Sequence, residues 1–169
     1  MSEPASRVAV LSISSTRAGG SGEEDRGGDE LVRYAEGLGG ELIARELIAD
    51  IRSLIEERIR QFCDVMLCDL VLTTGGTGFS PDDVTPEATL AVAERQAPGV
   101  AEAMRLASRE HTPHWMLSRN VAVIRGGTLI VNFPGSPKAI GEAGAAIAEA
   151  LPHALRLLRG TSGGHSSSA

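Results

Sequence analysis

Three short apolar runs, each followed by a polar loop, constrain the fold of this chain more than any other feature. The runs comprise residues 8–13, 70–74 and 128–133 and are rich in Val, Leu and Ile. Continuous apolar runs of this length are typical of strands that are buried on both faces of a sheet. Residues 42–48 alternate between apolar and polar side chains, and residues 121–124 form a fifth expected strand.

Segments with helical patterns separate these strands. We expect helices over residues 30–38, 51–66, 85–94, 100–109 and 138–158, the last interrupted near Pro152. Asp29, Asp50, Thr85 and Ser136 are the expected N-caps, and the last two are followed by proline, which suits the first helical position. Strands that alternate with helices predict an α/β fold, with a three-layer, doubly wound, mostly parallel sheet. Gly126 and Gly127 predict an antiparallel hairpin between the last two strands.

The chain has 169 residues, which is the usual size of a single domain. We expect one domain over residues 8–159, with residues 1–7 and 160–169 disordered. The net charge of −6 argues against a protein that binds nucleic acid through a basic surface. No apolar run approaches about 18 residues, so neither a membrane partner nor a signal peptide is expected. Cys63 and Cys68 form no disulfide framework, which suits the cytoplasm.

The loop after the third strand is rich in glycine and carries several hydroxyl groups. It contains Thr74, Gly75, Gly76, Thr77 and Gly78. Glycines leave backbone N–H groups unobstructed, and together with threonine hydroxyls these groups can bind an anion such as a phosphate. The loop matches neither the P-loop nor the dinucleotide-binding glycine pattern. A tight turn between strand and helix is the alternative interpretation.

A second loop with similar character follows the last strand. Asn132, Pro134, Gly135, Ser136 and Lys138 place a glycine, a hydroxyl and one cation at the start of a helix. Helix N-termini favour anions, so this loop is a second candidate phosphate site. An ordinary N-cap with proline is the alternative. Ser118 and Arg119 could hold a terminal phosphate or belong to a surface loop.

Five aspartates lie in loops or at helix starts, where they could serve a ligand. They are Asp25, Asp29, Asp50, Asp82 and Asp83. Each could instead be a helix cap or a turn residue. Carboxylates beside a phosphate repel it unless a cation lies between them, so a functional interpretation implies Mg²⁺.

Two segments of the chain resemble the molybdenum cofactor biosynthesis proteins of the MogA and MoaB type, whose domain also occurs in plant Cnx and in gephyrin. These segments are TGGTGFSPDDVTPEAT at residues 74–89 and NFPGSPKA at residues 132–139. The resemblance implies a molybdopterin adenylyltransferase, which converts ATP and molybdopterin into adenylyl-molybdopterin and pyrophosphate with Mg²⁺. It also implies a homo-oligomer, either a trimer or a hexamer.

The resemblance assigns roles to particular residues of this chain. Asp50 and Asp83 correspond to the two functional aspartates and are the candidate catalytic residues and Mg²⁺ ligands. Gly75 to Gly78 and Pro134 to Ser136 would line the pterin and nucleotide site, to which Ser14 of the first loop would also contribute.

Three positions depart from the pattern of the family. Asp82 stands where the family usually has arginine, and Ser15 follows Ser14 where the family usually has aspartate. Gly27 follows Asp25 and Arg26 where the family commonly has serine or a similar residue. The changes at Asp82 and Ser15 motivate an alternative function, a catalytically silent molybdopterin carrier or scaffold subunit. A hydrolase of pterins or nucleotides with the same fold is a further alternative.

Overall fold

The computed structural model describes residues 4–160, and its centre is one six-stranded sheet in the order β2-β1-β3-β6-β5-β4. The strands are β1 (Ser6–Ile13), β2 (Gly40–Ile48), β3 (Leu70–Thr74), β4 (Arg95–Gln96), β5 (Ala122–Arg125) and β6 (Thr128–Phe133). β2, β1, β3 and β6 are parallel, whereas β5 is antiparallel to both β6 and β4. The predicted fold class, a single α/β domain with a mostly parallel sheet, is confirmed.

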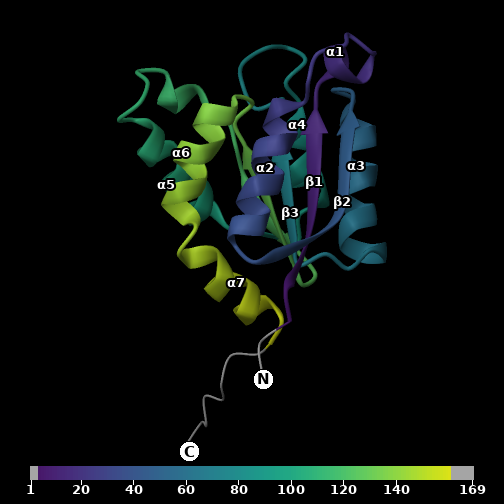
Figure 1. Cartoon of the computed structure of the whole chain (residues 1–169), viewed down its shortest axis with the longest axis vertical. Coiled ribbons are helices and arrows are strands. Elements are labelled where there is room, and N and C mark those ends of the chain that lie inside the picture. The colour runs from purple at the N-terminus through teal and green to yellow at the C-terminus, as the bar shows by residue number, and fades with distance from the viewer. Residues whose placement is uncertain (1–3, 161–169) are drawn as a thin grey trace, which may run out of the picture.

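Helices cover both faces of this sheet. They are α1 (Ser15–Ala18), α2 (Arg26–Gly37), α3 (Arg52–Arg60), α4 (Thr85–Val92), α5 (Pro98–Ser108), α6 (Pro137–Ile147) and α7 (Ala150–Leu158). A π-helical turn, η1 (Gln61–Val65), continues α3, and a 3-10 turn, η2 (Trp115–Leu117), precedes β5. Figure 1 shows α1 at the top, beside the ends of β1 and β2, and α7 at the opposite end of the domain.

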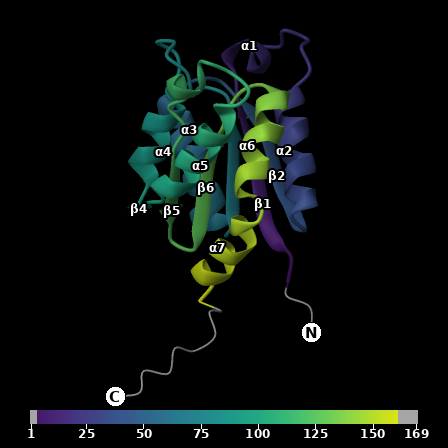
Figure 2. The ribbon, with the colours of Figure 1, turned by 90° about the vertical axis from the view of Figure 1, so that its left-hand side faces the viewer.

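Two apolar clusters, one on each face, hold the three layers together. On one face Val8 and Leu72 pack with Leu31 of α2, Ile140 of α6 and Leu151 of α7. On the other face the strand residues of opposite parity pack with α3, η1 and α4, through contacts that include Leu11, Val71, Ile55, Phe62 and Ala88. Successive strand residues point to opposite faces, so each buried strand contributes to both clusters. Figure 2 shows α3 and α4 on one side of the sheet and α2 and α6 on the other.

The expected start of α2 is wrong. Asp25 and not Asp29 is the N-cap, because its Oδ1 accepts a hydrogen bond of 3.0 Å from the amide of Gly28. The helix therefore begins at Arg26, and Asp29 lies in its first turn. The glycines at positions 27 and 28 disguise this turn, because glycine in a sequence usually marks the end of a helix and not its beginning.

The expected cap of α3 is also wrong. Ile51 occupies the N-cap position without a side-chain hydrogen bond, and the carboxylate of Asp50 bonds to the amide of Ser15 instead. The expected single helix over residues 51–66 is divided into two parts. The α-helix α3 ends at Arg60, and the π-helical turn η1 follows it directly.

The later helices agree more closely with the sequence. Ser136 caps α6 by accepting a hydrogen bond of 3.2 Å from the amide of Ala139, as expected. Thr85 is the first residue of α4 and not its cap, because its hydroxyl donates to the carbonyl of Gly75 at 2.9 Å. The break in the last helix falls at residues 148–149, before Pro152.

Three short features differ from the expectations. α1 and β4 have four and two residues, which is too short to show a periodic pattern. β1 begins at Ser6, two residues earlier than expected. The expected disorder at residues 1–3 and 161–169 falls outside the described residues. No helix within residues 4–160 has the length and apolar character that a membrane span requires.

Both cysteines are buried free thiols in the second apolar cluster. Burial raises the pKa of the Cys63 thiol to about 11. The nucleophilic thiolate is therefore scarce at neutral pH.

Candidate functional site

Three loops meet where β1, β3 and β6 end. These strands are neighbours in the parallel part of the sheet, so their carboxyl ends lie along one edge. The hydroxyl of Thr74 donates to the carbonyl of Pro134 at 2.7 Å, which joins the loop after β3 to the loop after β6. Ligands of doubly wound sheets bind at such an edge, outside the carboxyl ends of the strands. The two predicted phosphate loops are therefore adjacent.

The loop after β3, residues 75–84, which we call the glycine loop, needs glycine at its first two positions. Gly75 and Gly76 have φ values of +95° and +67°, a region that side chains with a Cβ rarely adopt. A Cβ on Gly75 would lie 2.2 Å from the carbonyl oxygen of Ile13, and one on Gly76 would lie 2.3 Å from Oγ1 of Thr85. The backbone of the glycine loop therefore packs against β1 and α4 with no room for a side chain at these two positions.

The N-terminus of α2 closes a third side of the site. A Cβ on Gly27 would lie 3.2 Å from Oγ1 of Thr74 and 3.3 Å from the carbonyl oxygen of Gly135. The first turn of α2 thus reaches both predicted phosphate loops. Helix N-termini carry partial positive charge, so this arrangement favours an anion between the loops.

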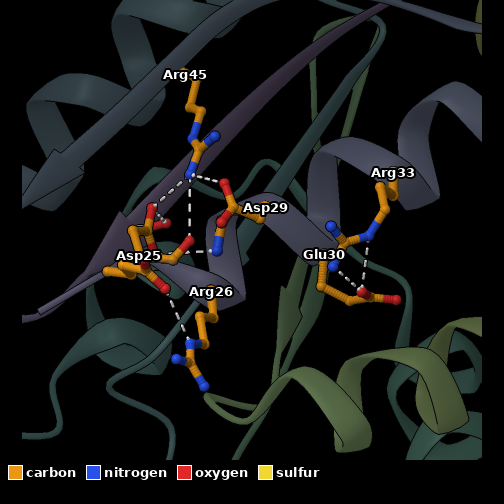
Figure 3. A network of polar contacts seen from close by, with 9 residues as sticks. Asp25, Arg26, Asp29, Glu30, Arg33 and Arg45 are labelled. Carbon is orange, nitrogen blue, oxygen red and sulfur yellow. Dashed lines mark hydrogen bonds and ion pairs between the residues drawn. The ribbon is translucent and has the colours of Figure 1, made fainter.

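A polar network holds this helix end in place. Asp25 accepts hydrogen bonds from the hydroxyl of Ser12 at 2.7 Å and from the guanidinium of Arg45 at 3.3 Å. Arg45 also forms an ion pair of 2.7 Å with Asp29, and Figure 3 shows its guanidinium between the two carboxylates. The contacts of Asp25 and Asp29 therefore support the structural interpretation of these two aspartates.

Asp83 lies within the glycine loop, and Asp50, which follows β2, lies beside it. Oδ2 of Asp50 accepts a hydrogen bond of 2.6 Å from the amide of Ser15, and Oδ2 of Asp83 accepts one of 2.9 Å from the amide of Ser80. Oδ1 of Asp50 lies 3.3 Å from the position that a Cβ on Gly76 would occupy. Oδ2 of Asp83 lies 2.8 Å from the corresponding position on Gly78. One of the two functional aspartates expected from the resemblance thus belongs to the glycine loop, and the other lies beside it.

These carboxylates suit a magnesium ion that is shared with a phosphate. Oδ1 of Asp50 and of Asp83 makes no hydrogen bond with any residue of the described range 4–160. Nor do three or more His, Cys, Asp or Glu residues cluster as a metal cage in that range. Mg²⁺ is usually held by one or two carboxylates together with substrate phosphates, so this donor set fits it.

Arg119 contacts the glycine loop and α4 with its guanidinium group. Nε donates to the carbonyl of Gly78 at 2.7 Å, Nη2 donates to the carbonyl of Asp83 at 2.6 Å, and Nη1 forms an ion pair with Glu87. The hydrogen bond from Arg119 is the main reason that the pKa of Glu87 lies below its usual value. Sequence reasoning did not select Glu87, which has the ordinary appearance of an acid in the first turn of a helix.

The remaining predicted site residues differ in their exposure, and Ser14 is half-buried. Asn132 is fully buried, and its amide donates to the hydroxyls of Thr73 and Thr89, so it joins β6 to β3 and α4 and cannot contact a ligand directly. Thr77 is buried, whereas Lys138 is exposed and forms only a long ion pair of 3.9 Å with Glu142. Ser14 caps α1 through a hydrogen bond of 3.4 Å from the amide of Arg17.

A small cavity of about 120 Å³ adjoins these loops. Ser118 and Pro134 line it together with Trp115, Met104 and Asn120. Its lining is largely apolar with a few polar groups, which is the usual character of a site for a small organic molecule. No local pattern in the sequence indicates this cavity, because its walls come from α5, η2, α6 and the loops that precede β5 and follow β6.

The fold and the loops together define an α/β protein whose two predicted phosphate loops lie side by side at the strand ends, and the family comparison agrees with this architecture. The model of the family described as a probable molybdopterin binding domain matches residues 9–153. The chain belongs to this family.

Relatives and solved structures support the same assignment. The chain is 46% identical over 115 residues to a molybdopterin adenylyltransferase of Helicobacter pylori J99, and this match covers 68% of the chain and 65% of the relative, just under two thirds of its length. It is 41% identical to the Escherichia coli K12 protein of the same name, covering 91% of the chain and 86% of the relative. The crystal structure of the molybdopterin biosynthesis enzyme MoaB from Thermus thermophilus is similar, with a TM-score of 0.85, 41% identity and coverage of 92% and 97% of the two chains.

Proposed function

We propose that this protein is a molybdopterin adenylyltransferase of molybdenum cofactor biosynthesis, which uses ATP with Mg²⁺. The observation that carries the proposal is the position of Asp83 within, and of Asp50 beside, a glycine loop that adjoins two helix N-termini. The names of the relatives at 39–46% identity support it.

The reaction is a transfer of an adenylyl group. An oxygen of molybdopterin attacks the α-phosphorus of ATP, a new P–O bond forms, and the bond to pyrophosphate breaks. Such an in-line displacement depends on positioning and on neutralisation of charge more than on a nucleophilic side chain. The glycine loop and the N-termini of α2 and α6 lie together at the strand ends, and in this proposal their backbone amides would supply the positioning and part of the neutralisation.

Each part of the site has a separate task in this proposal. Gly75 and Gly76 allow the glycine loop to pack closely against β1 and α4, and this packing would hold its backbone in place beside the phosphates. Asp50 and Asp83 would hold Mg²⁺ through their Oδ1 atoms, and the ion would neutralise phosphate charge. The cavity lined by Trp115 and Pro134 would accept the flat pterin beside the loops. By resemblance to the family we also propose a homotrimer, located in the cytoplasm.

The decisive test is an Asp83→Asn variant. An amide keeps the shape of the side chain and removes its charge, so formation of adenylyl-molybdopterin should fall at least about a hundredfold while the fold is retained. The product is measured by mass spectrometry after incubation with ATP, Mg²⁺ and molybdopterin. Asp64→Asn is the matched control, because Asp64 pairs with Arg125 away from the site. Equal rates for Asp83→Asn and the parent would refute the assignment.

A second candidate function is a catalytically silent molybdopterin carrier or scaffold subunit. Asp82 and Ser15, which differ from the residues usual in the family, favour it. Asp82 is exposed on the glycine loop and adds negative charge where phosphate is expected. Calorimetry separates the two functions, since a carrier binds molybdopterin without measurable affinity for ATP and Mg²⁺. A hydrolase would consume ATP and yield no adenylylated product.

A further inference from the structure

We propose that Arg119 is a positioning residue, which fixes the glycine loop and Asp83 with the help of Glu87, and that it is not a phosphate ligand. The inference rests on the proposed function, in which Asp83 acts at the reacting phosphates. It differs from the expectation based on residue type, in which an arginine near phosphates binds a phosphate directly.

Arg119 makes contacts near the start and at the end of the glycine loop, and one contact to α4, the helix that follows the loop. Its amide donates to the carbonyl of Thr77 at 2.9 Å, and its guanidinium donates to the carbonyls of Gly78 at 2.7 Å and Asp83 at 2.6 Å. Nη1 pairs with Glu87 in the first turn of α4. Nε, Nη1 and Nη2 each have a protein partner, so three of the five N–H donors of the guanidinium are engaged and only the second N–H of Nη1 and of Nη2 is left for a phosphate.

Only a guanidinium can make this set of contacts from one position. Its donors form a rigid planar fork, whereas the ammonium of lysine is a single point at the end of a flexible chain. Arg119 precedes β5, so the contacts join the site to the antiparallel edge of the sheet. The glycine loop is thereby held to a segment that follows it by more than thirty residues.

The contacts fix both parts of Asp83. Its main-chain carbonyl accepts from Arg119, and its Oδ2 accepts from the amide of Ser80. The carboxylate lies over Gly78, where a Cβ would come within 2.8 Å of it. A shift of the carbonyl would therefore move the carboxylate as well.

Glu87 is the third partner of the Arg119 guanidinium. Its carboxylate orients the guanidinium and neutralises its charge. Its side chain is 41% exposed and that of Arg119 is 33% exposed, so the pair is partly open to solvent. Arg119 holds the pKa of Glu87 below its usual value, and Glu87 is therefore ionised at neutral pH. A cation that is paired in this way contributes less attraction to a phosphate than a free one.

Two substitutions distinguish positioning from phosphate binding. With Arg119 as a positioning residue, Arg119→Lys lowers kcat by about tenfold or more and raises the Mg²⁺ concentration needed for half-maximal rate, while KM for ATP changes little. Glu87→Gln shifts both quantities in the same direction by a smaller factor. With Arg119 as a phosphate ligand, Arg119→Lys raises KM for ATP, and Glu87→Gln lowers it because the guanidinium is released. Either of these KM changes would overturn the proposal.

Arg125→Lys is the matched control. Arg125 also binds a carboxylate, Asp64, and a backbone carbonyl, that of Val92, but it lies at the other end of β5. Replacing the guanidinium of Arg125 by the ammonium of lysine should leave kcat and the Mg²⁺ dependence of the rate unchanged. If the control lost kcat to a similar extent, general destabilisation of the fold would explain the effect of Arg119→Lys. That result would overturn the proposal.

Hydrogen exchange tests the inference independently of activity. The amides of Ser80, Asp83 and Thr85 each donate to an acceptor in the glycine loop, at 2.9, 2.9 and 3.1 Å. Arg119→Lys should speed exchange in residues 79–85 at least about tenfold, and Arg125→Lys should not. Unchanged exchange would overturn the role of Arg119 even in an active enzyme. Faster exchange in a protein without adenylyl transfer would retain that role and reject the proposed function.

Discussion

Ser15 and Asp50 hydrogen-bond to each other in both directions. The amide of Ser15 donates to Oδ2 of Asp50 at 2.6 Å, and the amide of Asp50 donates to the hydroxyl of Ser15 at 2.9 Å. The two residues follow β1 and β2, which are neighbours in the sheet. The pair turns Oδ1 of Asp50 toward Gly76. A residue that departs from the usual family pattern thus holds one of the two functional aspartates expected from the resemblance.

Ser15→Ala should weaken this pair without abolishing it. The substitution removes the acceptor for the amide of Asp50, but the amide of Ser15 still holds the carboxylate. Loss of one exposed hydrogen bond should cost about 0.5–1.5 kcal/mol in the free energy of unfolding, measured by urea denaturation. The rate of adenylyl transfer should fall less than about tenfold.

Ser21→Ala is the control for this change. Ser21 is also exposed and accepts a backbone hydrogen bond, from Glu23 at 3.2 Å, but it does not contact Asp50. Stability and rate should stay close to those of the parent. A complete loss of activity in Ser15→Ala would mean that its hydroxyl acts directly on the substrate, contrary to the positioning role.

Two glycines of α6 should respond to alanine with opposite signs. A Cβ on Gly144 would lie 2.7 Å from the ring of Tyr34, whose hydroxyl donates to the carbonyl of Gly144 at 2.8 Å. Gly144→Ala should therefore destabilise the protein by about 1–3 kcal/mol through overpacking. A Cβ on Gly141 would meet its nearest atom at 3.8 Å. Gly141→Ala should stabilise the helix by about 0.5–1 kcal/mol.

Thermal unfolding of the two variants measures this difference. Both substitutions add the same methyl group to the same helix, so the intrinsic helix preference cancels in the comparison. A melting temperature of Gly144→Ala above that of Gly141→Ala would show that α2 and α6 do not pack through Tyr34 as described.

Stability should decline in acid because of ion pairs that lie outside the site. Burial alone would raise the pKa of Asp69, but the hydrogen bonds from Arg159 and from the amide of Arg7 outweigh it and lower the pKa. Hydrogen bonding to Arg125 similarly lowers the pKa of Asp64. A carboxylate with a lowered pKa in the folded state stabilises the protein fully above the unfolded value of about 3.9. That stabilisation is lost as the pH falls through the lower folded value.

Urea midpoints at pH 7, 5, 4 and 3 test this dependence. The midpoint of the parent should fall most below pH 4, and Asp69→Asn should lower the midpoint at pH 7 and reduce the difference between pH 7 and pH 3. Glu36→Gln, at an exposed position on α2, should reproduce the parental profile. An equally steep acid limb in Asp69→Asn would exclude Asp69 as a contributor.

Local patterns in the sequence were sufficient for the buried strands and the loops between them. β3 and β6 have the predicted bounds because each is an uninterrupted run of side chains that are buried on both faces. Gly126, with a φ of +55°, forms the predicted hairpin turn. The two phosphate loops follow from the same logic, since parallel strands bring their carboxyl ends to one edge.

The sequence by itself determined the layered α/β fold, the two glycine-containing loops and the resemblance to a family, because all of these depend on residues close together in the chain. Only the tertiary structure decided that Asp50 bonds to Ser15 and not to its own helix, that Asp25 caps α2, and that Arg119 holds the glycine loop. The physical reason is that carboxylates and guanidinium groups have several possible partners of similar energy. Packing of segments that are distant in the sequence determines which partner lies within reach.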